Sequence, residues 1–137
     1  KVRMKVTIVL EKSTTGYSAF SNDLQGLVTV GDSIDEVKEN FKEVIELQAD
    51  YLNEIGNKDE AQELLNADLF YYLDLETFFD YYSMFNKSKL ADYLGINQSL
   101  LRRMSKEKNV ELSDKKAEQI ENGLHRLADE LKEIHFA

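Results

Sequence analysis

Four side chains between positions 98 and 103 have the types and spacing needed to recognise DNA bases. Gln98 and Arg102 are four residues apart, and so are Ser99 and Arg103. On a helix each pair therefore lies on one face. The forked donors of glutamine and arginine match adenine and guanine edges in the major groove, and a serine hydroxyl donates to phosphate. The predicted chemistry is hydrogen bonding to DNA.

The surrounding segment, residues 87–104, predicts the two helices that would position these side chains. Gly95 is placed where the chain leaves a first helix, and Asn97 is a favourable N-cap for a second one. The residues expected to face inward are Leu90, Ala91, Leu94, Ile96, Leu101 and Met104. This spacing predicts a helix-turn-helix motif. A pair of surface helices that never contacts DNA is the alternative.

Lysines flank the second helix and are expected to contact phosphates. They are Lys87, Lys89, Lys106 and Lys108. Residues 84–116 carry eight basic and four acidic residues, a net charge of +4, whereas the rest of the chain has a net charge of −13. A basic segment on an acidic chain is compatible with local DNA binding, and the acidic remainder suits a basic protein partner.

Residues for catalysis or metal binding do not form a comparable set. The carboxylates of Asp23, Asp32, Asp35 and Glu36 are explained by turn and helix-cap positions. His125 and His135 are ten residues apart, which does not fit a metal pair on one helix face. The chain has no cysteine, and it contains no phosphate-binding glycine loop or nucleophile motif. We expect no enzymatic activity, no metal and no other cofactor.

The composition predicts a folded cytoplasmic protein with one or two domains. Its 137 residues are 42% hydrophobic, which is enough to build a core. No apolar run approaches the roughly 20 residues that a membrane span requires. The absence of cysteine fits a reducing compartment.

Alternating apolar and polar residues predict strands in the first half of the chain. The alternation is clearest over residues 2–10, and shorter β-prone runs follow at 17–20 and 27–30. These three runs predict an antiparallel meander. The aromatic-rich residues 70–73 predict a fourth strand.

A long helix is expected between the third and fourth strands. Ser33 and Glu36 form a capping box at its start, and Gly56 ends it. The apolar face of this helix comprises Ile34, Val37, Phe41, Val44, Ile45, Leu52 and Ile55. Residues 58–66 predict a short acidic helix. The predicted first domain is therefore a β-β-β-α-β unit, and the fold class is α+β.

Aromatic residues concentrate where the two predicted domains meet. A helix from about Asp74 would present one apolar stripe and continue into the helix-turn-helix. The members of that stripe are Leu75, Phe78, Phe79, Tyr82 and Phe85. Stacking of bases on these rings is disfavoured, because the acidic side chains of Asp74, Glu76 and Asp80 lie among them and repel phosphate. The predicted domains are residues 1–74 and 75–137.

A final helix from Ser113 or Asp114 to about His135 has a heptad pattern of apolar residues. The expected dimerisation residues are Ile120, Leu124, Leu127 and Leu131. Spacing alone leaves a dimer seam and packing within the chain equally open. Helix-turn-helix proteins commonly bind paired half-sites, which favours a homodimer or a higher homo-oligomer.

The first domain resembles the HicB antitoxin family in the order of four short motifs. They are Gly16-Tyr17, Asp23-Leu24-Gln25-Gly26, Thr29-Val30-Gly31-Asp32-Ser33 and Glu36-Val37-Lys38-Glu39-Asn40. The resemblance spans residues 2–74. The family usually has Pro-Asp-Leu-Pro-Gly at the second motif, where this chain has Asn22 and Gln25, and alanine where it has Val37.

This resemblance implies a partial ribonuclease-H-like fold that binds and blocks a small basic HicA-like toxin, which is an mRNA-cleaving ribonuclease. The C-terminal helix-turn-helix would then repress the operon by binding operator DNA. The alternative is a stand-alone transcriptional regulator whose first domain senses a ligand or assembles the oligomer. A nuclease would need a carboxylate constellation that the sequence does not present.

Overall fold

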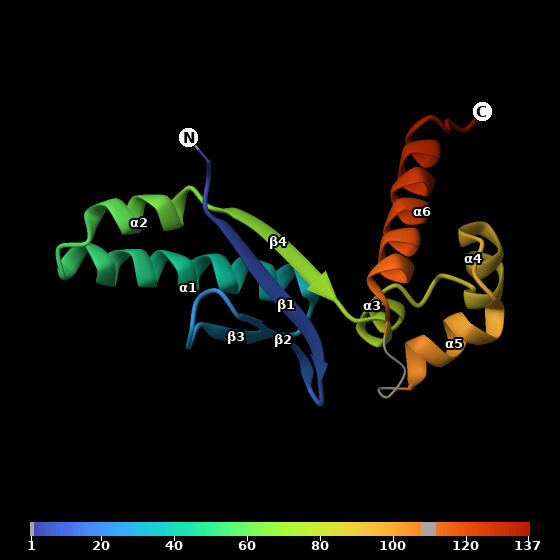
Figure 1. The fold of residues 1–137 in the computed structure, drawn as a ribbon, viewed down its shortest axis with the longest axis horizontal. Helices are drawn as coiled ribbons and strands as arrows, with labels where there is room; N and C mark the ends of the chain where they lie inside the picture. The colour runs from blue at the N-terminus through green and yellow to red at the C-terminus, as the bar shows by residue number, and fades with distance from the viewer. Residues whose placement is uncertain (1, 108–111) are drawn as a thin grey trace. The chain divides into compact units, whose positions relative to one another are not determined.

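The computed structural model describes residues 2–107 and 112–137 (Figure 1). The chain divides into two compact units, Lys1–Tyr81 and Tyr82–Ala137. The first unit is mixed α and β, and the second is helical, so the overall class is α+β as expected. None of the helices in the described parts of the chain is long and apolar enough to cross a membrane.

The first unit is built on one four-stranded sheet with the strand order β3-β2-β1-β4. Its strands are β1 (Lys5–Ser13), β2 (Gly16–Ser21), β3 (Val28–Gly31) and β4 (Asp68–Leu73). The pairs β1–β2 and β2–β3 are antiparallel, whereas β1 and β4 are parallel. The predicted meander and fourth strand are therefore confirmed, and β1 begins later than the alternating pattern does.

Two helices, α1 (Ile34–Glu54) and α2 (Lys58–Leu65), connect β3 to β4 (Figure 1). The Ser33 hydroxyl accepts a hydrogen bond from the Glu36 backbone N–H at 3.1 Å, so the predicted cap is present. The helices and strands share one core cluster, whose fully buried members include Val6, Ile8, Leu10, Val37 and Phe41. Burying each such side chain stabilises the unit by about 1.5–3 kcal/mol.

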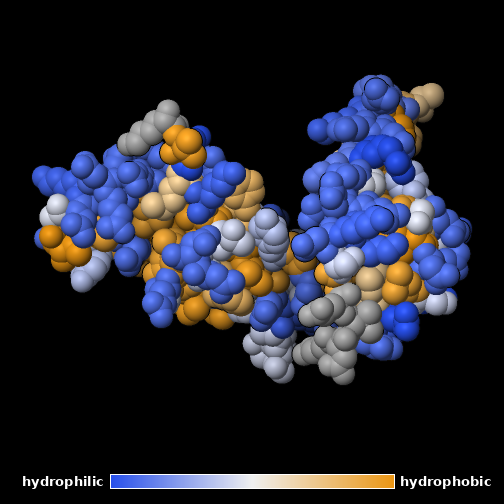
Figure 2. Space-filling model, in the orientation of Figure 1, coloured by the Kyte–Doolittle hydropathy of each residue, from blue (hydrophilic) through white to orange (hydrophobic). Residues whose placement is uncertain are grey.

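The opposite face of the sheet carries a row of apolar side chains that crosses all four strands. Tyr72 lies beside Val9, Val9 beside Phe20, and Phe20 beside Val28. These side chains alternate with buried ones in β1 and β2 and with half-buried ones in β3 and β4, so they point away from the core. Hydrophobic side chains accordingly gather over the strands in the space-filling view (Figure 2).

The helix expected from about Asp74 is shorter than predicted. Helix α3 (Leu75–Tyr81) ends before Tyr82 and does not continue into α4. A turn follows, in which the Phe85 N–H donates to the Tyr82 carbonyl at 3.2 Å. The prediction that Tyr82 and Phe85 continue the apolar stripe of this helix was therefore wrong. The division between the units falls after α3, so α3 belongs to the first unit and not to the helix-turn-helix segment.

Polar contacts made by Thr77 and Asp80 join α3 to the β1–β2 hairpin. The buried Thr77 hydroxyl accepts a hydrogen bond from the Lys12 backbone N–H at 3.1 Å. Asp80 accepts hydrogen bonds from the Lys12 ammonium at 2.6 Å and from the Tyr17 hydroxyl at 2.9 Å. The bonds from Lys12 and Tyr17 hold the pKa of Asp80 below its ordinary value. These contacts explain why Thr77, which lies outside the expected stripe, is buried.

Gly16 begins β2 where a side chain would not fit. A Cβ at this position would collide with the backbone carbonyl oxygen of Gly31 in the paired strand β3. We expect Gly16→Ala to lower the free energy of unfolding by about 2 kcal/mol, as overpacking of a tight site does. Urea denaturation followed by circular dichroism measures this change. The exposed neighbour Thr15→Ala is the control and should shift stability by less than about 0.5 kcal/mol; equal stability of the two variants would contradict the clash.

Candidate functional site

Two helices joined by a tight turn are present at the predicted place in the second unit. Helices α4 (Lys87–Leu94) and α5 (Gln98–Lys106) are separated by a turn in which Gly95 has a φ of 73°. Glycine adopts this left-handed conformation without the steric cost that a side chain adds. The turn is closed by a hydrogen bond from the Ile96 N–H to the Ala91 carbonyl at 2.9 Å.

Both helices of the motif begin at an asparagine cap. The Asn97 side chain accepts a hydrogen bond from the Leu100 N–H at 3.1 Å, as predicted. Asn86 caps α4 in the same way, accepting from the Lys89 N–H at 3.0 Å. The sequence analysis missed the Asn86 cap, although an asparagine directly before a helix is its usual signal.

The inward-facing residues of the motif were predicted correctly. All six are buried: Leu90, Ala91, Leu94, Ile96, Leu101 and Met104. Among the described residues of the unit three more are buried: Ile120 and Gly123 from α6 (Asp114–Lys132), and Ser105, whose hydroxyl donates to the Arg102 carbonyl at 2.9 Å. The interior of the unit therefore fixes which face of α5 is turned outward.

The outer face of α5 holds the four side chains predicted to read bases. Ser99, Arg102 and Arg103 are exposed, and Gln98 is half-buried. Among the flanking lysines, Lys106 and Lys89 are exposed, Lys87 is half-buried, and Lys108 lies outside the described residues. Four cationic or polar side chains therefore share one exposed surface of α5, which we call the α5 face: Ser99, Arg102, Arg103 and Lys106.

Gln98 is held by an acidic neighbour that the sequence analysis did not single out. Its side-chain amide donates to both carboxylate oxygens of Asp92, at 2.9 and 3.1 Å. Asp92 is exposed, so it places a negative charge at the N-terminal end of α5. The two residues are on different helices, and helical spacing gives no signal of their contact. To bind a base, the Gln98 side-chain amide must break its hydrogen bonds to Asp92 or share its donors between Asp92 and the base.

The cations of the α5 face differ in the hydrogen bonds that their side chains make. The Arg102 guanidinium donates to the Ser88 hydroxyl at 3.0 Å, which brings the first turn of α4 beside α5. Within residues 2–107 and 112–137, the side chains of Arg103 and Lys106 make no hydrogen bond or ion pair. Arg103 is therefore the arginine whose donors are available without breaking a contact.

The N-termini of the two helices are also favourable for phosphate. Neither α4 nor α5 has an acidic residue in its first turn, whereas α1, α2, α3 and α6 each have at least one. A helix N-terminus carries a partial positive charge and free N–H groups, which attract anions unless an acidic side chain compensates them. Neither helix of the motif compensates this charge with an acidic residue of its own first turn, although the Asp92 carboxylate of α4 lies beside the start of α5.

Helix α6 packs on α4 within the same chain. The Gln119 amide donates to the carbonyls of Leu94 and Gly95, both at 3.0 Å. Arg126 donates to the Tyr93 hydroxyl and carbonyl, at 3.2 and 3.1 Å, and its guanidinium carbon lies 4.7 Å from the ring centre. The hydrogen bond with Tyr93 raises the pKa of Arg126 above its ordinary value. Helix α6 therefore stabilises the turn between α4 and α5 through hydrogen bonds to the carbonyl groups of that turn.

The four predicted dimerisation residues lie in different environments along α6. Ile120 is buried in its own unit, Leu124 and Leu127 are half-buried, and Leu131 is 56% exposed. The seam thus changes from packing within the chain at its start to an exposed apolar surface at its end.

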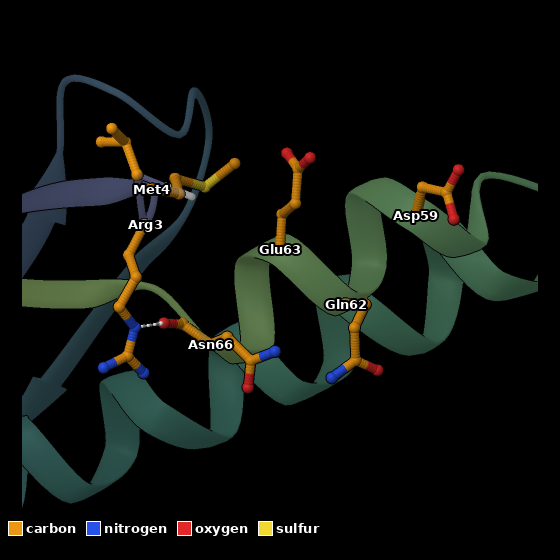
Figure 3. Close-up of a pocket in the computed structure, with 7 residues that line it drawn as sticks. Arg3, Met4, Asp59, Gln62, Glu63 and Asn66 are labelled. Atoms are coloured by element: carbon orange, nitrogen blue, oxygen red, sulfur yellow. Dashed lines mark hydrogen bonds between the residues drawn. The ribbon is translucent and has the colours of Figure 1, made fainter.

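One pocket of about 570 Å³ lies in the first unit, between the segment before β1 and α2. Arg3 is already engaged there, donating to the Asn66 carbonyl at 3.0 Å and lying 3.4 Å from an Asp68 carboxylate oxygen. Figure 3 shows the carboxylates of Asp59 and Glu63 pointing away from Arg3. Polar groups that converge on one point are usual in ligand sites, and these do not converge. Among the residues that the structure describes, no group of three or more acidic or histidine side chains is placed to hold a metal ion.

Comparison of the chain with protein-family models, with curated proteins and with solved structures found no match.

The Asp92 carboxylate should weaken DNA binding by repelling phosphate near the start of α5. We expect Asp92→Ala to raise the affinity for a random-sequence duplex by about two- to fivefold in 0.1 M salt, since nearby exposed charges interact by roughly 1 kcal/mol or less. Fluorescence anisotropy measures the change. Asp129→Ala removes the same charge from an exposed position on α6 and is the control. Equal effects of both substitutions would show that Asp92 has no local role.

Proposed function

We propose that this chain is a DNA-binding antitoxin of the HicB type. The second unit would bind operator DNA through the α5 face and repress its own operon. The first unit would bind and neutralise a small basic toxin ribonuclease. The observation that carries the DNA-binding part is the α5 face itself, in which Arg103 and Lys106 are exposed on a helix that follows a glycine turn.

The distribution of charge supports two different partners. The first unit contains 17 acidic and 7 basic residues, a net charge of −10, whereas the second contains 9 acidic and 10 basic residues, a net charge of +1. Polyanionic DNA is repelled by the first unit and is tolerated by the second. A basic protein is steered toward the first unit by the same field.

Several residues of the motifs that resemble the HicB family form hydrogen bonds or turns that hold the first unit together. Asp23 accepts a hydrogen bond from the Thr7 backbone N–H at 2.7 Å, and Gly26 has a φ of 82° in the turn before β3. The Asn40 amide donates to the Val30 carbonyl at 2.9 Å and ties α1 to β3. These roles explain why such residues would recur in a domain of this type, and they support the family proposal.

The alternative from the sequence, a stand-alone regulator, predicts DNA binding without a protein partner. Co-expression of this chain with any short basic open reading frame found beside its gene, followed by purification on a tag carried by this chain, separates the two. Recovery of a stoichiometric complex supports the antitoxin. Absence of such a reading frame, or of the complex, with operator binding retained favours the regulator.

The exposed end of α6 is the part of the heptad seam that would join two copies. Leu131→Glu places a charge in that contact, and a buried unpaired charge is strongly destabilising. We expect a wild-type dimer and a folded monomeric variant in sedimentation velocity. Ala128→Glu, at an exposed position on the same helix, is the control and should remain dimeric. A monomeric wild type, or a dimeric Leu131→Glu variant, would show that the exposed end of α6 does not join two copies.

Arg103 and Lys106 should differ in what their loss does to DNA binding. Arg103→Ala should cost about 1–3 kcal/mol on the operator and relax base preference at one position, because a bidentate base contact is lost. Lys106→Ala should weaken all sequences alike and make the salt slope shallower by about one unit. Anisotropy titrations on operator and scrambled duplexes at several salt concentrations measure both. If Arg103→Ala binds both duplexes as the wild type does, α5 does not read bases.

A further inference from the structure

Two columns of side chains run side by side along the second half of α1. Successive members of each column are four residues apart, so they stack along one side of the helix. The apolar column is Leu47, Tyr51 and Ile55, where Ile55 is the C-cap; the acidic column is Glu46, Asp50 and Glu54. We call these six residues the α1 face.

The apolar column is unusually exposed for its composition. Leu47, Tyr51 and Ile55 are 68%, 54% and 52% exposed, although α1 buries its other apolar stripe against the sheet. Single exposed apolar residues are common on protein surfaces, but three in register form a continuous strip. Figure 2 shows a small hydrophobic group amid hydrophilic side chains at the end of the unit where α1 meets α2.

The acidic column weakens the helix that carries it. Its members are like charges at i and i+4, and they lie toward the C-terminal end of α1, where the helix dipole disfavours negative charge. No basic residue occupies the last turn of α1. In the described parts of the chain none of these three carboxylates forms an ion pair. The structure shows no contact through which the acidic column stabilises the first unit. This points to a role in binding another molecule.

We propose that the α1 face is the docking surface for a basic protein whose own surface presents lysines or arginines around apolar side chains. Charge complementarity identifies this occupant, because carboxylates at one-turn intervals attract cations while the strip beside them excludes water. The inference rests on the proposed function, since the partner is the toxin. A second copy of the chain is disfavoured, as a two-fold contact would bring the acidic columns together. Nucleic acid is repelled.

The uncovered sheet face is a weaker candidate for the same partner. Its central row consists of Tyr72, Val9, Phe20 and Val28, none of which is charged, so it gives no preference for a basic protein. It serves as the comparison surface in the test.

Charge reversal separates docking from folding on the α1 face. The variant carries Glu46→Lys, Asp50→Lys and Glu54→Lys. These changes keep like charges one turn apart but suit the helix dipole at the C-terminal end of α1, so we expect a Tm close to that of the wild type. Binding of the full chain to the protein encoded by the adjacent basic reading frame should fall by at least about 100-fold in calorimetry.

A matched control changes the net charge equally on the neighbouring helix α2. It carries Asp59→Lys, Glu60→Lys and Glu63→Lys, all at exposed positions. We expect it to lose less than about tenfold in affinity, because only long-range attraction is reduced. Equal losses in both variants would mean that net charge, and not the α1 face, governs binding, and would overturn the proposal.

Neutral substitutions test the apolar column separately. Leu47→Ser with Tyr51→Ser should weaken binding by at least about 30-fold, as loss of an interface anchor does. Phe70→Ser with Tyr72→Ser, on the uncovered sheet face, should bind as the wild type does. Loss of binding in the sheet variant alone, or wild-type binding by every α1 variant, would overturn the docking surface and leave the proposed function standing. A wild-type chain that does not bind the basic protein would overturn both.

Discussion

The parallel pairing of β1 with β4 determines how the rest of the first unit is arranged. It leaves β3 and β4 parallel at opposite edges of the sheet, so no tight turn can join them and the chain must cross the sheet from β3 to β4. Helices α1 and α2 make this crossing, and α1 buries the stripe that faces Val6, Ile8 and Leu10. Its other side stays in water. The connection that completes the sheet therefore also provides the exposed α1 face, with its apolar and acidic columns.

The second unit is close to neutral, with a net charge of +1. Its central constraint is the left-handed turn at Gly95, which sets α5 against α4 and turns Arg103 and Lys106 outward. Helix α6 holds this turn through Gln119. The two units thus present different surfaces, an acidic helix suited to a basic protein and a cationic helix suited to DNA. This separation underlies the proposal of two partners for one chain.

Much of this architecture was predictable because its signals are local. Alternation marked the strands, Ser33 and Asn97 marked helix starts, and the inward side of the helix-turn-helix followed from spacing. The burial of Thr77 was missed because its hydroxyl accepts a hydrogen bond from the Lys12 N–H, 65 residues away in the chain. The bond between Gln98 and Asp92 was missed because it joins two helices. The acidic column of α1 was visible in the sequence, but its place beside an exposed apolar strip required the packing of the unit.

We propose that this chain neutralises a basic toxin through its first unit. The most direct measurement is growth of a bacterial host that expresses the adjacent basic reading frame from an inducible promoter, with and without this chain. The account predicts that the basic protein alone arrests growth and that the full chain restores it. Growth arrest that persists when both proteins are present in soluble form would contradict the account, as would a basic protein that is harmless when expressed alone.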